Sequence, residues 1–372
     1  MNRYLSIENR LSHWLNQQKL WTIWVVLFAL LSVLLLPLTH PALWRFPASL
    51  SKAIQDAGSY YWHTIVYQAQ HPFDKAYFET MEPQWHEAKM VFRLILPILY
   101  KIFGSQSMVI VAQIAAGIGF LYLSAKITLE ATASRLIALY VLLGLVGIYV
   151  GSAFVFDIVG CGDAFGYLAL AGAVYFYRQP VWLFLFLQMG YWTDERALIC
   201  SPLVGIYWWI HHQKSIKLPV PLPIRTPLLV LGASWLLYLG ARWGISMHYG
   251  LLTPTKSADF NYLLQTPVLS LFFKTARSFE SFWVLIIALF YVLWSQKRFM
   301  ELFFIGGSFL VSYLVAIMVA DTSRSLGYAF VVIFMALSVL KDHLQNPRWR
   351  WWLLVGMLLN ILVPTRYLFY DA

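Results

Sequence analysis

Residues 21–38 read WTIWVVLFALLSVLLLPL, an apolar run that contains no charged side chain. A helix needs about 20 apolar residues to cross the hydrocarbon core of a bilayer, so this run predicts a membrane-spanning helix. It is too long for the apolar region of a cleavable signal peptide, and it lacks a small-residue cleavage site. We therefore interpret it as an uncleaved signal anchor.

The composition extends this prediction to the whole chain. Of the 372 residues, 60% are hydrophobic and only 12% are charged, whereas a typical soluble domain has about 25% charged residues. An outer-membrane barrel would show segments of alternating polarity instead of unbroken apolar runs. The pattern predicts an all-α polytopic membrane protein with about 9–11 transmembrane helices.

Polar stretches divide the sequence into regions. Residues 1–19 form a polar N-terminal segment, and residues 20–372 form a single multi-span membrane domain. Within that domain, residues 40–107 predict a long first outer loop and residues 242–280 a second one. These loops are long enough to carry helices of their own.

Three apolar segments give more detailed expectations. Residues 136–156 are long enough to predict one membrane span. Residues 90–103 are interrupted by charged residues and proline, which predicts an interfacial or re-entrant helix on the outer surface. Residues 268–279 predict a second surface helix.

The charges give an orientation. If the N-terminus is cytoplasmic, the inner segments hold 14 Lys and Arg against four acids, whereas the outer segments hold 13 against 13. Basic residues in short loops mark the cytoplasmic side, so we expect a multi-pass protein with its N-terminus inside. The net charge of +10 comes from these membrane-flanking loops. We therefore expect no nucleic-acid partner.

Polar residues gather in five clusters on the expected outer face. Clusters far apart in sequence would then share one membrane depth, as an interfacial active site requires. The candidate site residues drawn from these clusters are Asp56, Tyr60, Tyr61, His86, Arg93, Asp157, Asp163, Asp194, Glu195, Arg196, Asp321 and Arg324.

Most of these residues also have a purely structural interpretation. Asp157 and Asp163 could simply cap helices, since Asp is a favoured N-cap, and Asp163 directly precedes an apolar segment. Asp194 and Glu195 lie where a helix dipole favours acids. Asp321 and Arg324 could form a simple ion pair, and His86 could be an ordinary loop histidine. Asp56 has no obvious capping role.

The arrangement resembles the GT-C superfamily of polytopic glycosyltransferases. Asp56, followed by Tyr60 and Tyr61, is similar to the acidic residue near the start of the long first outer loop in that superfamily. Arg93-x-x-x-Pro97 and Thr193-Asp-Glu-Arg196 are similar to stretches that open membrane segments in its members.

A fourth motif, Asp321-x-x-Arg324, looks like the late outer Asp/Arg loop of the superfamily. Several GT-C enzymes carry an adjacent acidic pair in the first loop, and this loop has none at that position. This departure bears on the identity of the catalytic acid.

The resemblance implies sugar transfer from a polyprenyl-phosphate donor to a lipid or glycan acceptor, at the outer face of a bacterial inner membrane. It implies that Asp56 is the base that deprotonates the acceptor hydroxyl. Arg93 or Arg324 would stabilise the departing phosphate through bidentate hydrogen bonds. The other candidates would bind substrate. The sequence has no metal motif, although scattered carboxylates could hold Mg²⁺ or Mn²⁺. The expected partners are the donor, the acceptor and membrane lipids.

Two other classes of function remain open. A transporter or lipid flippase predicts charged groups at membrane depth and often an internal repeat, and the sequence shows little of either. A non-catalytic subunit of a glycan-assembly complex predicts that the outer carboxylates can be replaced without effect.

Overall fold

The computed structural model describes residues 2–39, 41–55, 61–79, 90–214, 225–251, 264–319 and 321–362. Throughout these ranges the regular elements are helices. Several helices are long and apolar enough to cross a bilayer. The chain is therefore a helical membrane protein.

The first half of the chain contains two long helices, α2 and α8, together with shorter helices before, between and after them. In order, these are α1 (Asn2–Gln17), α2 (Trp21–Thr39), η1 (Pro41–Arg45), α3 (Phe46–Gln55), α4 (Trp62–Gln70), α5 (Lys75–Glu79), η2 (Met90–Phe92), α7 (Ile95–Phe103), α8 (Gln106–Thr132), α9 (Arg135–Gly147), α10 (Tyr149–Phe156) and α11 (Asp163–Tyr175).

The second half continues the bundle. Its helices are α12 (Pro180–Thr193), α13 (Glu195–Lys214), α14 (Arg225–Tyr249), α16 (Val268–Phe279), α17 (Phe282–Ser295), α18 (Phe299–Ile317), α19 (Thr322–Gly327), η4 (Tyr328–Phe330), α20 (Val331–Val339), α21 (Lys341–Leu344) and α22 (Pro347–Leu362).

By length and composition, five helices in the described ranges are candidate membrane spans. The candidates are α2, α8, Thr226–Tyr249 of α14, α18, and the continuous run Thr322–Val339. Two bent pairs, α9 with α10 and α16 with α17, raise the number to seven if each pair is one span. Nine spans would need two more helices and eleven would need four. The further candidates are α11, α12, α13 and α22, of 13, 14, 20 and 16 residues. The higher number therefore stays a prediction.

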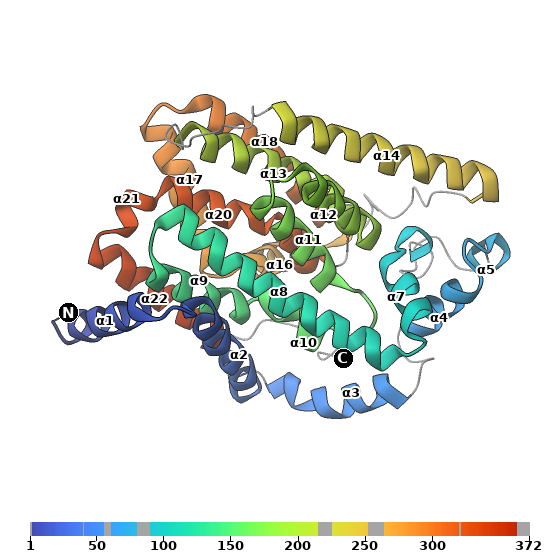
Figure 1. The fold of residues 1–372 in the computed structure, drawn as a ribbon, viewed down its shortest axis with the longest axis horizontal. Coiled ribbons are helices and arrows are strands. Elements are labelled where there is room, and N and C mark those ends of the chain that lie inside the picture. The colour runs from blue at the N-terminus through green and yellow to red at the C-terminus, as the bar shows by residue number, and fades with distance from the viewer. Residues whose placement is uncertain are drawn as a thin grey trace.

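The run Thr322–Val339 forms the centre of the bundle. Inside the protein, 94% of it is buried, because α8, α13 and α17 pack around α20. In Figure 1, α8 crosses the front of this core, whereas α14 runs along one edge of the ribbon. Only 17% of the α14 span is buried. The least lipid-exposed candidate span is thus the one that begins at the Asp321–Arg324 motif.

The expected span over residues 136–156 is bent instead of continuous. The chain bends by 58° between α9 and α10, and Ile148 at the break has an extended backbone. A Cβ atom on Gly151 would lie 2.2 Å from the carbonyl oxygen of Leu145, so the bend requires glycine there. The break turns α10 away from the line of α9 and changes the direction in which its side chains project.

Other boundaries also differ from the sequence prediction. The second surface helix is confirmed, since α16 spans Val268–Phe279. Residues 90–103 form two elements, η2 and α7, instead of one helix. The second long loop begins later than residue 242, because α14 continues to Tyr249 and ends before Gly250, whose φ is +65°. Whether the short helices between α2 and α8 lie at a membrane interface stays a prediction.

Replacement of Gly147 by alanine is expected to destabilise the bundle. A Cβ atom at Gly147 would lie 2.6 Å from the backbone carbonyl carbon of Asn360 on α22, and backbone atoms cannot move aside by a rotamer change. Overpacking of this kind costs about 1–3 kcal/mol. Thermal unfolding in detergent should show a lower midpoint for Gly147→Ala.

The matched control is Gly307→Ala on α18. A Cβ atom there meets nothing within 4 Å, and alanine is favoured over glycine in a helix by about 0.5–1 kcal/mol. Its midpoint should stay level or rise. Equal midpoints for both variants would contradict the close contact between α9 and α22.

Candidate functional site

Charged side chains from four distant parts of the chain meet inside the bundle. Arg93 lies between η2 and α7, Asp163 begins α11, residues 194–196 join α12 to α13, and residues 321–324 begin α19. We call the group formed by Arg93, Asp163, Asp194, Glu195, Arg196, Asp321 and Arg324 the ion network. All seven were candidates from sequence, and their side chains lie in ion-pair contact.

One half of the network is centred on Asp194. Arg196 donates two parallel hydrogen bonds to its carboxylate, from Nε to Oδ1 and from Nη2 to Oδ2, each 2.6 Å long. The backbone N–H of Arg196 also donates to Oδ1, at 2.9 Å. Arg93 Nη1 lies 2.9 Å from Asp194 Oδ2, and its Nη2 lies 3.3 Å from Glu195 Oε1. Asp194 therefore both holds the first turn of α13 and binds two arginines.

The other half is centred on Asp163. Arg324 contacts both of its oxygens, through Nε and, at 3.2 Å, through Nη2. Tyr149 and Tyr328 each donate a hydroxyl hydrogen bond of 2.8 Å. These contacts replace the capping role expected for Asp163, because it makes no side-chain cap and the N-cap position is Gly162.

Arg196 connects the two halves. Its Nη2 lies 3.4 Å from Asp163 Oδ1, and its Nη1 donates to Ser325 Oγ at 3.0 Å. The guanidinium also lies over the ring of Tyr328, 4.9 Å from the ring centroid. Arg324 completes the group with a 3.3 Å contact from Nη1 to Asp321. The expected Asp321–Arg324 ion pair is present, and it is part of the larger ion network.

Asp157 joins the network through a shared tyrosine. The hydroxyl oxygen of Tyr149 lies 2.8 Å from Asp163 and 3.3 Å from Asp157, but a hydroxyl has only one proton to donate. A proton on Asp157 resolves this, because the carboxyl group can then donate to the tyrosine. Burial, followed by the nearby charge of Asp163, raises the pKa of Asp157 to about 7. Its Oδ1 atom is buried and has no hydrogen-bond partner among the described residues.

The two central carboxylates of the ion network are buried, whereas two other carboxylates are partly exposed. The side chains of Asp163 and Asp194 are fully buried, whereas Glu195 is 33% and Asp321 23% exposed. Burial alone would raise the pKa of Asp194, but the charges of Arg196 and Arg93 hold it well below its ordinary value. Including Asp157, five carboxyl groups face three arginines. With every carboxyl group ionised, the carboxylates would exceed the arginines by two charges, and a proton on Asp157 reduces that excess to one.

Glycines shape the backbone around the network. Gly160 and Gly162 have φ of +97° and +75°, values that suit glycine and let the 157–163 loop turn inward. A Cβ atom on Gly166 would lie 2.7 Å from the Tyr328 hydroxyl. Glycine at that position lets the tyrosine reach Asp163.

The described part of the first loop is attached to the same place. Tyr61 donates its backbone N–H to Val159 O at 3.1 Å. Trp62 Nε1 donates to Ile158 O at 2.8 Å. The start of α4 is thus tied to the acidic loop that carries Asp157. Asp56, Tyr60 and His86 lie outside the described residues.

Three residues in or beside the site were not found from the sequence. Tyr149 and Tyr328 lie within apolar segments, where tyrosine is common, and no local pattern separates them from other tyrosines. A third is Arg242 on α14, which donates to the Tyr238 hydroxyl at 3.1 Å. Its guanidinium lies 4.4 Å from the ring centroid of Phe92. The sequence could not place any of these three residues at the site, because their positions depend on how distant helices pack together.

The carboxylates do not form a metal site in the described residues. No group of three or more His, Cys, Asp or Glu side chains there could hold a metal ion. Their oxygens accept hydrogen bonds from arginines and tyrosines instead. These carboxylates therefore offer no fitting ligand set for Mg²⁺ or Mn²⁺ in the described part of the chain.

Asp194→Asn should destabilise the protein strongly. Removing one partner of a buried ion pair leaves uncompensated charge and costs about 3–5 kcal/mol, and Asp194 has two arginine partners. Asp342→Asn is the matched control, because Asp342 is an exposed acid. Thermal unfolding in detergent measures both. Similar midpoints for the two variants would show that the ion network contributes little to stability.

Asp157→Asn should change the dependence of stability on pH. Because the pKa of Asp157 is raised to about 7 in the folded protein, from about 3.9 in an unfolded chain, its ionisation destabilises the fold as pH rises between these values. In detergent, the thermal unfolding midpoint of the variant should be higher than that of wild type at pH 8. The difference between the two midpoints should shrink towards pH 5. A difference that is constant or grows towards acid would contradict the shifted pKa.

The chain was also compared with known proteins. No protein-family model, curated protein or solved structure matches it. The functional argument therefore depends on the residues themselves. The ion network is the feature that a function must explain.

Proposed function

We propose that the protein is a GT-C-like membrane glycosyltransferase with about 9–11 spans and a cytoplasmic N-terminus in a bacterial inner membrane. It would transfer a sugar from a polyprenyl-phosphate donor to a lipid or glycan acceptor at the outer face. The observation that carries the proposal is the ion network, because it joins three of the four motifs that resemble this superfamily. Those motifs contribute Arg93, the 194–196 segment and the 321–324 segment.

The cost of the network supports a functional role. Burying charges requires desolvation, and apolar side chains of similar volume often give equal or better stability. Here the fully buried Asp163 and Asp194 lie in a bundle whose other buried side chains are mostly apolar. Perturbed carboxylates of this kind cluster at functional sites.

Acceptor activation requires a base with a pKa close to the working pH. Asp56 is the base implied by the resemblance. Asp157 is a second candidate, since its pKa is raised to about 7 and one carboxyl oxygen is without a hydrogen-bond partner in the described residues. The attachment of Tyr61 to Val159 supports a site formed jointly by the first loop and the acidic loop.

Departure of the lipid phosphate requires a cation. Arg93 and Arg324 are the cations implied by the resemblance, and both already contact carboxylates. Arg242 makes no ion pair with a described residue and lies over Phe92, the neighbour of Arg93. We therefore assign Arg242 a share in phosphate binding, with Arg93 at the edge of the network.

Glycan profiles of living cells test the enzyme proposal. Lipid-linked and surface glycans of a deletion strain are compared by mass spectrometry with strains rescued by wild type, Asp56→Asn, Asp157→Asn or the control Asp342→Asn. We expect a glycan to be missing in the deletion strain, to return with wild type and Asp342→Asn, and to stay missing with at least one of the other variants. Membrane levels of each variant are measured in parallel.

The outcomes separate the hypotheses. If both Asp56→Asn and Asp157→Asn restore the profile, neither carboxylate is the base. If deletion changes no glycan, the glycosyltransferase proposal fails. If every carboxylate variant restores a glycan that deletion removes, a non-catalytic subunit explains the result better.

A transporter is the second candidate, and Asp157 favours it. A buried carboxyl group with a pKa near neutrality in a membrane protein could also carry a proton during transport. Purified protein in detergent separates the two functions, because detergent leaves no second compartment. Transfer of labelled sugar from a polyprenyl-phosphate donor under these conditions supports the enzyme, and transport would require sealed vesicles.

A further inference from the structure

A cavity lies between α17, α21 and α22, and no residue of the ion network lines it. Its volume is about 540 Å³, and its 13 lining residues include two polar or charged ones, Ser281 and Arg348. The others are aliphatic, aromatic or glycine. Cavities of about 300–1,000 Å³ are large enough to hold a small molecule.

The cavity has a buried floor and an exposed rim. Leu285, Leu344 and Met357 are almost completely buried and form the floor. Val284 and Trp352 on the rim are 64% and 67% exposed. In a membrane-spanning protein such exposed apolar side chains face lipid, so the cavity opens towards hydrocarbon.

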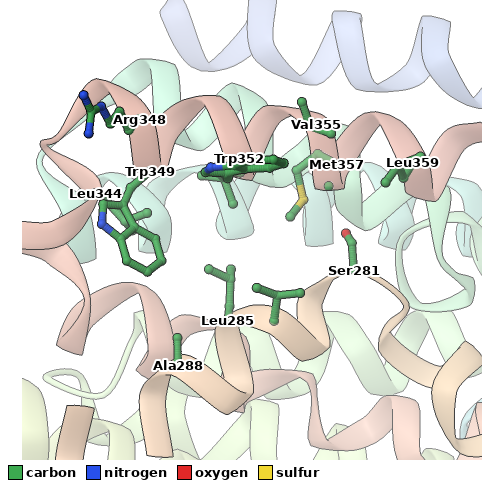
Figure 2. Close-up of a pocket in the computed structure, with 13 residues that line it drawn as sticks. Ser281, Leu285, Ala288, Leu344, Arg348, Trp349, Trp352, Val355, Met357 and Leu359 are labelled. Atoms are coloured by element: carbon green, nitrogen blue, oxygen red, sulfur yellow. The ribbon is translucent and has the colours of Figure 1, made fainter. Parts of the chain in front are cut away.

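The helices themselves define the ends of the cavity. At one end α17 touches α22, where the backbone N–H of Ser281 donates to Asn360 Oδ1 at 2.9 Å. At the other end Leu344 and Trp349 close the space beside Arg348 (Figure 2). The lining side chains of α22 run from Arg348 to Leu359, which corresponds to about 16 Å along a helix.

This length fits one leaflet of a bilayer. The hydrocarbon core is about 30 Å thick, so one leaflet contributes about 15 Å. An acyl chain is the apolar molecule that a membrane supplies with this length. Its glycerol and phosphate groups would then lie at the Arg348 end.

The charges at that end suit an anionic headgroup. Arg348 is exposed and makes no side-chain ion pair with any residue that the structure describes. Lys341 and one acid, Asp342, lie on α21, the helix that precedes α22. Arg350, by contrast, is neutralised by Glu8, 2.6 Å away. From sequence this end faces the cytoplasm, where anionic lipids attract basic residues.

We propose that the cavity is a binding site for one anionic phospholipid. One acyl chain lies between α17 and α22, and the phosphate contacts Arg348. Trp349 and Trp352 lie beside the chain, as expected for tryptophan near a membrane interface. The bound lipid would fill the gap between the α16–α17 pair and α22.

Two substitutions test the two halves of this proposal. Ala288→Phe places a ring inside the apolar part of the cavity, since Ala288 is one of its lining residues. Arg348→Gln removes the cation and keeps an exposed polar side chain. Lys19→Gln is the matched control, because Lys19 is an exposed basic residue that does not line the cavity.

The proteins are reconstituted in nanodiscs with equal amounts of phosphatidylglycerol and phosphatidylethanolamine, extracted, and examined by native mass spectrometry. Wild type and Lys19→Gln should retain one phospholipid, enriched in phosphatidylglycerol. Arg348→Gln should reduce that enrichment by about fivefold, the ratio expected for loss of one basic residue at a lipid surface. Ala288→Phe should lose the bound lipid and keep a thermal midpoint at or above that of wild type.

Several results would overturn the proposal. They are retention of the lipid by Ala288→Phe, unchanged lipid preference in Arg348→Gln, and equal retention of both lipids by wild type. A retained polyprenyl species in place of a phospholipid would also overturn it. Arg348→Gln changes only an exposed side chain, so its result stands even if Ala288→Phe fails to fold.

Discussion

The carboxylate of Asp163 is the interaction on which the rest of the candidate site depends. It is fully buried, and it accepts hydrogen bonds from Arg324, Tyr149 and Tyr328. These donors come from two different parts of the bundle, α10 and the central run Thr322–Val339. A buried charge without partners would cost far more than the fold can supply. The relative positions of α10, α11 and the central run Thr322–Val339 are therefore constrained by one side chain.

This constraint explains irregularities in the neighbouring helices. The break at Ile148 directs α10, and with it Tyr149, towards the site. Gly166 gives the Tyr328 hydroxyl room beside α11. These features weaken local packing or helix continuity, and straight helices would satisfy the hydrophobic effect equally well. They make physical sense as the means by which polar groups reach a buried carboxylate.

The negative excess of the site gives it a chemical character. Three arginines are already paired with carboxylates. An anionic substrate would therefore have to compete with these carboxylates for the arginines. Asp157 is the member best placed to gain or lose a proton, since its pKa is raised to about 7. For the function that we propose, Asp157 is therefore the candidate for proton transfer. Recognition of a phosphate would depend more on cations at the edge, such as Arg242.

The sequence by itself determined the membrane class, the helical fold and all the acidic and basic residues of the ion network, because apolar length and charge placement act locally along the chain. It could not reveal Tyr149, Tyr328 or Arg242, because their roles come from neighbours that are far away in sequence. The bend at Ile148 could not be predicted either, because an apolar run of 21 residues is also long enough for a straight span. Only tertiary packing decided which carboxylate met which arginine, because a buried charge selects its partner by geometry in three dimensions.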